Sequence, residues 1–182
     1  SGYRDTKDGK ASSDSIVGYS STVFGATASA GKLKGLTADK MANALGIAAA
    51  TAPVNSQRAW FMHAPTATIK YQLAGGLTSV ALTAADLADL GHRGDVQMLD
   101  DESCGYPRFI GTARWNPDLL TQGLGEDWRF PAFQMFKPYP HCRILHALLD
   151  VMGEILDMHQ IRPEEIASIK DYVEGMVEQP VW

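Results

Sequence analysis

Apolar and small side chains recur at helical spacing in four segments, and this pattern predicts a mainly α-helical fold. Residues 22–34 consist mostly of Ala, Gly, Ser and Thr, which allow neighbouring helices to approach closely. A second helix is predicted to begin after Thr37, whose side chain suits an N-cap, and to end before Pro53. Residues 69–90 and 142–159 complete the set, and the last segment carries a broad stripe of Leu, Ile and Met.

The other predicted elements are short. Gly35 and Gly91 are expected to end the first and third helices, because glycine is common just beyond a helix C-terminus. The Gly75-Gly76 pair either kinks the third helix or admits a close neighbour. We further predict a polar loop or frayed terminus at 1–17 and a long loop with one short strand or helix at 92–116. A short helix capped by Asn116 is expected at 117–123, strands at 128–136 and 166–173, and a helical turn at 163–165.

The composition fits a globular protein, since 45% of the 182 residues are hydrophobic and 20% are charged. A net charge of −5 without runs of Lys and Arg argues against nucleic acid or an anionic membrane as a partner. No segment resembles a membrane span or a signal peptide. Cys104 and Cys142 form no CxxC pair, so we expect reduced thiols, a cytoplasmic location and no metal site. The acidic run at 100–102 is interpreted as a solvated loop.

The segment from Phe136 to His146 holds two prolines, a tyrosine, a thiol and four potentially cationic groups directly before the last helix. Pro138 and Pro140 restrict the backbone, so Lys137 would be presented at a defined angle. Cations gathered before a helix start suit an anion, because the first N–H groups of that helix are unpaired. The segment is therefore predicted to hold a small carboxylate; a proline-stiffened loop with a surface lysine is the open alternative.

The order Lys137-Pro138-Tyr139-Pro140, followed by Cys142-Arg143 and His146, resembles the KPYPxCRxxH signature of the MmgE/PrpD family. Further similarities are the Gly/Ala-rich segment 24–36, the segment 42–48 and a lysine before a helix at Lys70. This family includes 2-methylcitrate dehydratase, cis-aconitate decarboxylase and iminodisuccinate epimerase.

The resemblance implies a large all-helical domain and a smaller α+β domain, with a metal-free and cofactor-independent active site between them. Residues 1–135 would belong to the helical domain, and residues 136–182 would hold the proline motif, a helix and the start of the smaller domain. Family members are considerably longer than this chain, so the chain would be an internal piece. We also expect a homodimer.

The resemblance assigns two lysines to the active site. Lys70 and Lys137 would bind or polarise substrate carboxylates, and either lysine could act as a base in a partly desolvated cleft. For Lys70, a solvated residue at a helix start is the alternative. The chain lacks two histidines that are frequent in the family: residues 18–22 contain none, and Leu73 stands where many members have one.

Several other residues are candidates for the same site. Tyr19 could act as an acid and Ser20 as a hydrogen-bonding group where the family histidine is missing. His63 and His141 are candidates for substrate binding. His146 is a third, although a packed structural histidine is the favoured interpretation. Cys142 is interpreted as a buried small residue and not as a nucleophile, because no supporting Cys/His arrangement accompanies it.

Two functions follow from these residues. The first is a lyase, either a dehydratase or a decarboxylase, or an isomerase, acting on a small di- or tricarboxylic acid by proton abstraction next to a carboxylate. The second is a non-catalytic fragment or family member that binds a carboxylate ligand or a partner subunit.

Overall fold

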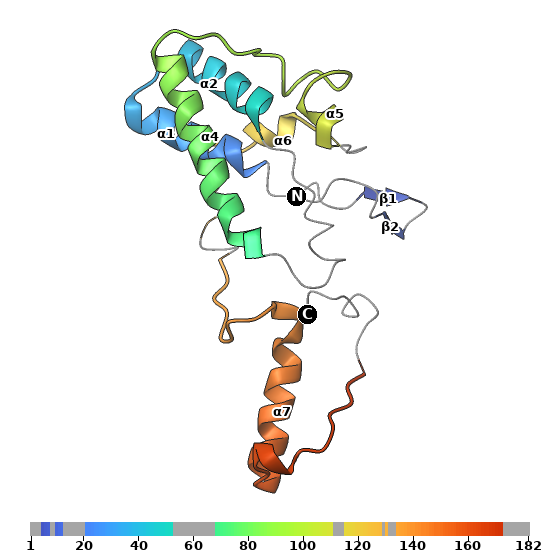
Figure 1. Cartoon of the computed structure of the whole chain (residues 1–182). Coiled ribbons are helices and arrows are strands. Elements are labelled where there is room, and N and C mark those ends of the chain that lie inside the picture. Colours follow the sequence, from blue (N-terminus) through green and yellow to red (C-terminus); the bar gives the residue numbers. More distant parts are fainter. Residues whose placement is uncertain are drawn as a thin grey trace. The chain divides into compact units, whose positions relative to one another are not determined.

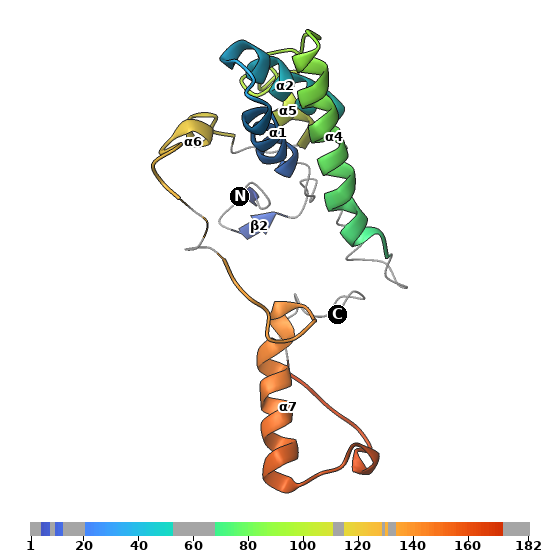
Figure 2. The same cartoon turned by 90° about the vertical axis from the view of Figure 1, so that its left-hand side faces the viewer.

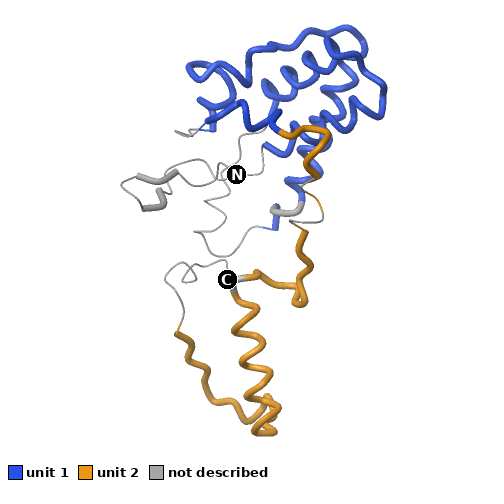
Figure 3. The backbone as a smooth tube through the Cα atoms, turned by 180° about the vertical axis from the view of Figure 1, so that it is seen from behind, with its two compact units in different colours: residues 1–122 blue, residues 123–182 orange. Residues whose placement is uncertain are grey.

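A computed structural model of the chain describes residues 5–7, 10–12, 21–52, 68–110, 115–128, 130 and 134–172. Of residues 5–7, 10–12, Lys70, Tyr71 and Ile144 it describes the backbone alone. The chain forms two compact units, residues 1–122 and residues 123–182 (Figure 3). The predicted division at residue 135 follows the family resemblance and stays a prediction.

The first unit is built on three helices, α1 (Thr22–Lys34), α2 (Ala38–Thr51) and α4 (Gln72–Asp89), each of which packs on the other two (Figure 1). Shorter elements accompany them: an antiparallel strand pair, β1 (Asp5–Lys7) and β2 (Lys10–Ser12), the 3-10 helix η1 (Thr68–Tyr71), α5 (Tyr106–Ile110) and α6 (Asp118–Thr121). The predicted mainly α-helical fold is confirmed.

The core of the first unit lies where α1, α2 and α4 meet. Its buried members are mostly small, namely Val23, Ala48, Leu77, Ala81 and Ala84. Small side chains bring the helix axes close together, so many atoms are in van der Waals contact although few large side chains are present. The Ala-rich and Gly-rich composition of these helices is therefore the reason that they pack as a compact group.

The ends of the helices follow the predicted signals. The Thr37 hydroxyl accepts a hydrogen bond from the backbone N–H of Lys40 at 3.4 Å, as an N-cap does. Gly35 and Gly91 have φ angles of 69° and 94°, the left-handed conformation that ends a helix. Helix α4 is preceded by a 3-10 turn and then runs through the Gly75-Gly76 pair without a break.

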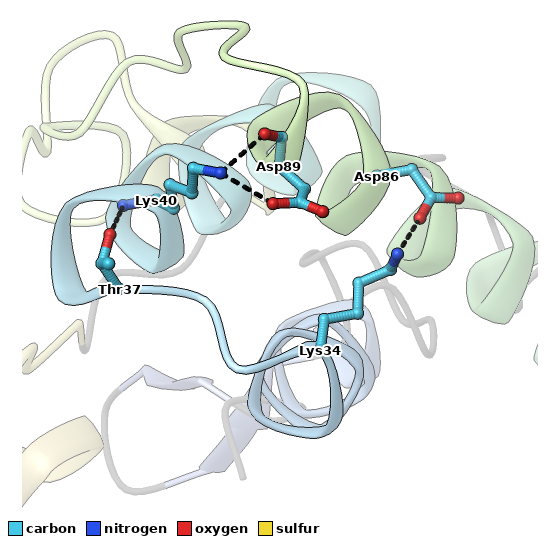
Figure 4. A network of polar contacts seen from close by, with 5 residues as sticks. All are labelled: Lys34, Thr37, Lys40, Asp86 and Asp89. Carbon is cyan, nitrogen blue, oxygen red and sulfur yellow. Dashed lines mark hydrogen bonds and ion pairs between the residues drawn. The ribbon is translucent and has the colours of Figure 1, made fainter.

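Two ion pairs tie α4 to the helices beside it (Figure 4). Lys34, in the last turn of α1, lies 2.7 Å from the Asp86 carboxylate. Lys40, in the first turn of α2, donates to both the backbone carbonyl and the carboxylate of Asp89, each at 2.7 Å. Both lysines of this network therefore have an aspartate as partner.

The loop after α4 lies directly on α2. A Cβ atom added at Gly46 would meet the backbone of Asp95, with the carbonyl carbon only 2.8 Å away. The Asn43 side chain accepts a hydrogen bond from the Gly94 N–H at 3.0 Å. The loop then leads into α5, where the buried Tyr106 ring stands edge-on to Phe24 with 4.8 Å between the ring centroids. Of the two alternatives predicted for this long loop, a short strand or a short helix, the structure shows the helix.

The second unit consists of the 3-10 helix η2 (Arg143–Leu145), α7 (His146–His159) and the 3-10 helix η3 (Pro163–Glu165). After α7 the chain reverses and runs back along the helix (Figure 2). Gln160, with a φ of 52°, makes the turn at which the reversal begins. The predicted helical turn at 163–165 is confirmed.

Four sequence predictions need correction. The segment 1–17, predicted as a loop or a frayed terminus, contains the strands β1 and β2, which pair with each other. The last helix is α-helical only from His146, because its first turn, which follows Pro140 and Cys142, is a 3-10 helix. The strand expected at 128–136 is not formed by Trp128, Phe130 or residues 134–136, which are those of it that the structure describes. Residues 166–172 form no strand either, because no partner strand lies beside them in the described chain. The expected start of an α+β domain stays a prediction.

A short helix, α6, lies within the predicted segment 117–123 but spans only Asp118–Thr121, and its N-cap residue is Pro117 and not Asn116. The Asn116 side chain accepts a hydrogen bond from the Asp118 N–H at 3.1 Å. None of the helices in the described part of the chain combines the length and apolar character needed to cross a bilayer.

Candidate active site

The proline segment before α7 holds Lys137 in a defined place. Its ammonium group donates a hydrogen bond to the backbone carbonyl of His141 at 3.0 Å and so closes the segment on itself. Within the described part of the chain this is the contact that Lys137 makes, and no carboxylate pairs with it. An ammonium group has three N–H donors, so two remain for another acceptor.

Tyr139 connects the middle of the segment to α7. Its phenol donates to the Asp150 carboxylate at 2.5 Å, and this hydrogen bond raises the pKa of Tyr139 above its ordinary value of 10.0. Its ring stands edge-on to the imidazole of His146, with 5.2 Å between the ring centroids. Asp150 and His146 are one helical turn apart on α7, so Tyr139 contacts one face of that helix.

His146 is packed, with 8% of its surface exposed. Its Nε2 lies 3.4 Å from the His141 carbonyl, the same oxygen that accepts from Lys137. A ring held by these contacts supports the motif, and its binding of substrate stays a prediction. The side chain of His141 is exposed, and its backbone carbonyl carries the contacts of this residue. Cys142 was expected to be buried, but the structure shows it half-buried.

The other predicted site residues are not brought into this cluster. Lys70 lies in the 3-10 helix η1, and its side chain is outside the described residues. Tyr19, Ser20 and His63 are outside the described residues altogether. The convergence of Lys70, Lys137 and Tyr19 on one substrate therefore stays a prediction.

Asp150 is the residue that sequence reasoning missed. The sequence does place Asp150 on the same face of the helix as the candidate His146, because residues four apart on a helix share a face. The interaction with Tyr139 joins residues eleven positions apart across a 3-10 turn, and helical periodicity does not extend through that turn.

The acidic run at 100–102 organises a turn. The Asp101 carboxylate accepts hydrogen bonds from the backbone N–H groups of Ser103 and Cys104, from the Ser103 hydroxyl and from the Cys104 thiol. These donors hold the pKa of Asp101 well below its ordinary range, and the same carboxylate raises the pKa of Cys104. Cys104 therefore loses its proton less readily than an ordinary cysteine, which does not favour a role as a nucleophile. Among the residues described, no group of three His, Cys, Asp or Glu side chains is arranged to hold a metal ion.

Residues 12–118 match the family model of the MmgE/PrpD N-terminal domain. This range contains α1, α2 and α4, and it ends before the proline segment. Members of the family are generally lyases and isomerases. No curated protein and no solved structure gives a match. Because the matched residues make up more than half of the sequence, the chain belongs to the MmgE/PrpD family.

Proposed function

We propose that this chain takes part in cofactor-independent lyase or isomerase chemistry on a small di- or tricarboxylic acid. The observation that carries the proposal is the state of Lys137: a cation fixed by a neutral carbonyl, with no carboxylate partner among the described residues. An anionic substrate group can take the remaining donors of such a lysine without displacing an existing ion pair.

The proposed reaction begins with the C–H bond next to a substrate carboxylate. A base takes the proton, and the electron pair moves into the carboxylate to give an enolate-like dianion. In a dehydration the electron pair then returns to form a C=C bond, and the β-hydroxyl leaves as water after taking a proton. In an epimerisation a proton returns to the opposite face. A decarboxylation instead breaks the C–C bond to a carboxylate, and the carbon that keeps the pair is protonated.

Lys137 would stabilise the negative charge that grows on the carboxylate oxygens during these steps. A donor fixed before the reaction begins needs little reorganisation when the charge develops, which is the usual origin of such stabilisation. Lys70 and Tyr19 are proposed as the acid–base groups, and Ser20, His63, His141 and His146 as contacts to the substrate. These assignments rest on the sequence and on the family.

A non-catalytic carboxylate-binding protein is the second candidate. Leu73 favours it, since this half-buried residue of α4 stands where many family members have a histidine. A binding protein would keep the use of Lys137 and would lack turnover.

The test uses the complete protein that contains this chain, with a panel of small di- and tricarboxylic acids. Proton NMR in D₂O reports deuterium incorporation, loss of water, decarboxylation and epimerisation in a single measurement. We expect one of these reactions, and we expect Lys137→Ala to lower kcat/KM by about 10²–10³-fold, the usual cost of removing one preorganised donor.

The matched control is Lys32→Ala, which removes an exposed lysine on α1 that forms no ion pair among the described residues. Circular dichroism verifies that both variants are folded. Equal activity of the Lys137→Ala variant and the wild type would refute the role of Lys137. Saturable binding of a carboxylate without any reaction in the panel would favour the second candidate.

A further inference from the structure

The proline segment is closed on itself at its ends and attached to α7 at its midpoint. At the ends, Lys137 and His141 are joined by the 3.0 Å hydrogen bond from the ammonium group to the carbonyl. At the midpoint, the Tyr139 phenol donates to Asp150 at 2.5 Å. This five-residue loop cannot slide along the helix without breaking the charge-assisted hydrogen bond to Asp150.

The contact with Asp150 is the polar part of this midpoint attachment, and the edge-on contact with His146 is the apolar part. Tyr139 lies between two prolines, so its backbone has little freedom and the position of its phenol largely fixes the position of the loop. Lys137 is two residues away within the same rigid stretch. A displacement of the phenol would therefore move the lysine backbone.

We propose that Asp150 is a positioning residue, which holds the Tyr139 phenol and thereby sets the direction of the Lys137 ammonium group toward an anionic substrate. This inference rests on the proposed function of Lys137. In this arrangement the carboxylate of Asp150 is engaged by a neutral phenol and forms no ion pair with Lys137, so the lysine stays available for a substrate.

The raised pKa of Tyr139 agrees with this arrangement. A phenol that donates to a carboxylate loses its proton less readily, so Tyr139 remains a donor throughout the neutral range. This property does not depend on catalysis, and it gives the inference a second readout.

The experiment compares Asp150→Ala with Asp150→Asn in the complete protein, each with Lys137 present and with Lys137→Ala. Asparagine keeps an acceptor oxygen for the phenol, whereas alanine removes it.

We expect Asp150→Ala to lower kcat/KM by about 10- to 100-fold, the cost of misplacing a reacting group by about 1 Å. Asp150→Asn should retain activity within about threefold, because the hydrogen bond loses its charge assistance only. Glu154→Ala, one turn further along α7, is the control for removal of an exposed acid.

The Lys137→Ala background separates positioning from folding. If Asp150 acts through Lys137, then Asp150→Ala has no further effect once the lysine is absent. An equal loss in both backgrounds would show that Asp150 supports the fold alone and would overturn the inference. An inactive Asp150→Ala variant that does not fold is replaced by Tyr139→Phe, which keeps the ring against His146 and removes the donor.

A spectroscopic titration completes the test. The difference in tyrosinate absorbance between each protein and its Tyr139→Phe counterpart gives the pKa of Tyr139, which should fall toward 10.0 in Asp150→Ala. An unchanged pKa would also overturn the inference. If Lys137→Ala is fully active, the proposed function fails and the inference fails with it. If Lys137→Ala is impaired and Asp150→Ala is not, only the inference fails.

Discussion

Lys34 and Lys40 of the first unit are used differently from Lys137 of the second unit. In the first unit, Lys34 and Lys40 are each paired with an aspartate of α4 at 2.7 Å (Figure 4). In the second unit, Lys137 donates to a backbone carbonyl and has no acidic partner in the described chain. The first two charges hold helices together, whereas the third is fixed in place and left available. The proposed function of Lys137 rests on this difference.

Apolar side chains on the helices are also more exposed in the second unit than in the core of the first. Leu77 of α4 is 2% exposed, whereas Ile155, on the apolar stripe of α7, is 43% exposed. The helical periodicity is as clear in α7 as in α4, yet the described residues of the second unit supply no layer that covers the stripe. Pattern alone predicts which face of a helix is apolar, and it does not predict what covers that face.

A pair of truncations tests this difference, with the largest expected effect. Leu77→Ala should lower the free energy of unfolding by about 2–5 kcal/mol, because it leaves a cavity in a closely packed core. Ile155→Ala should lower it by about 1 kcal/mol or less, since much of that side chain is already in contact with water. Urea unfolding followed by circular dichroism gives both values. Equal losses would mean that the stripe on α7 is covered in solution, and the contrast between the units would be lost.

Two glycines of the first unit sharpen the comparison, with intermediate effects of opposite sign. Gly46→Ala should destabilise the protein by about 1–3 kcal/mol, because the new methyl group would push the backbone of Asp95 away from α2. Gly25→Ala, on an exposed position of α1, should stabilise it by about 0.5–1 kcal/mol, because alanine is the better helix former. The same unfolding measurement applies. A neutral Gly46→Ala would show that the loop does not rest on α2.

The sequence predicted the parts of the fold that depend on local chemistry. Thr37, Gly35 and Gly91 mark helix ends because capping and a left-handed φ are properties of a few neighbouring residues. The strand predicted at 166–173 failed for the opposite reason, since alternation of side chains does not create a partner strand, and the residues described there have none.

In the candidate site, too, the features set by neighbouring residues were predictable and those set by distant contacts were not. The restraint on Lys137 could be inferred from Pro138 and Pro140, which act on adjacent residues. The hydrogen bond from Lys137 to the His141 carbonyl and the contact of Tyr139 with Asp150 could not be inferred from the sequence. Both depend on how the proline segment folds before and against α7.

The smallest expected effect concerns the ion pairs of the first unit, and its sign follows from two pKa shifts. The hydrogen bond from Lys40, with its positive charge, lowers the pKa of Asp89 below 3.8, so this pair stabilises the fold above that pH and loses its effect as the pH falls through the lowered pKa. The hydrogen bond to Asp86, with its negative charge, raises the pKa of Lys34 above 10.5, so at alkaline pH that pair loses its effect as the pH rises through the raised pKa. The urea midpoint of unfolding of Lys40→Met should therefore change less between pH 5 and pH 3 than the midpoint of the wild type. The midpoint of Lys34→Met should differ from the wild type in its pH dependence at alkaline pH. Both pairs are exposed, so high salt should reduce the differences. Identical pH profiles for wild type and both variants would show that these lysines are no more engaged than Lys137, and the distinction between paired and available cations would no longer hold.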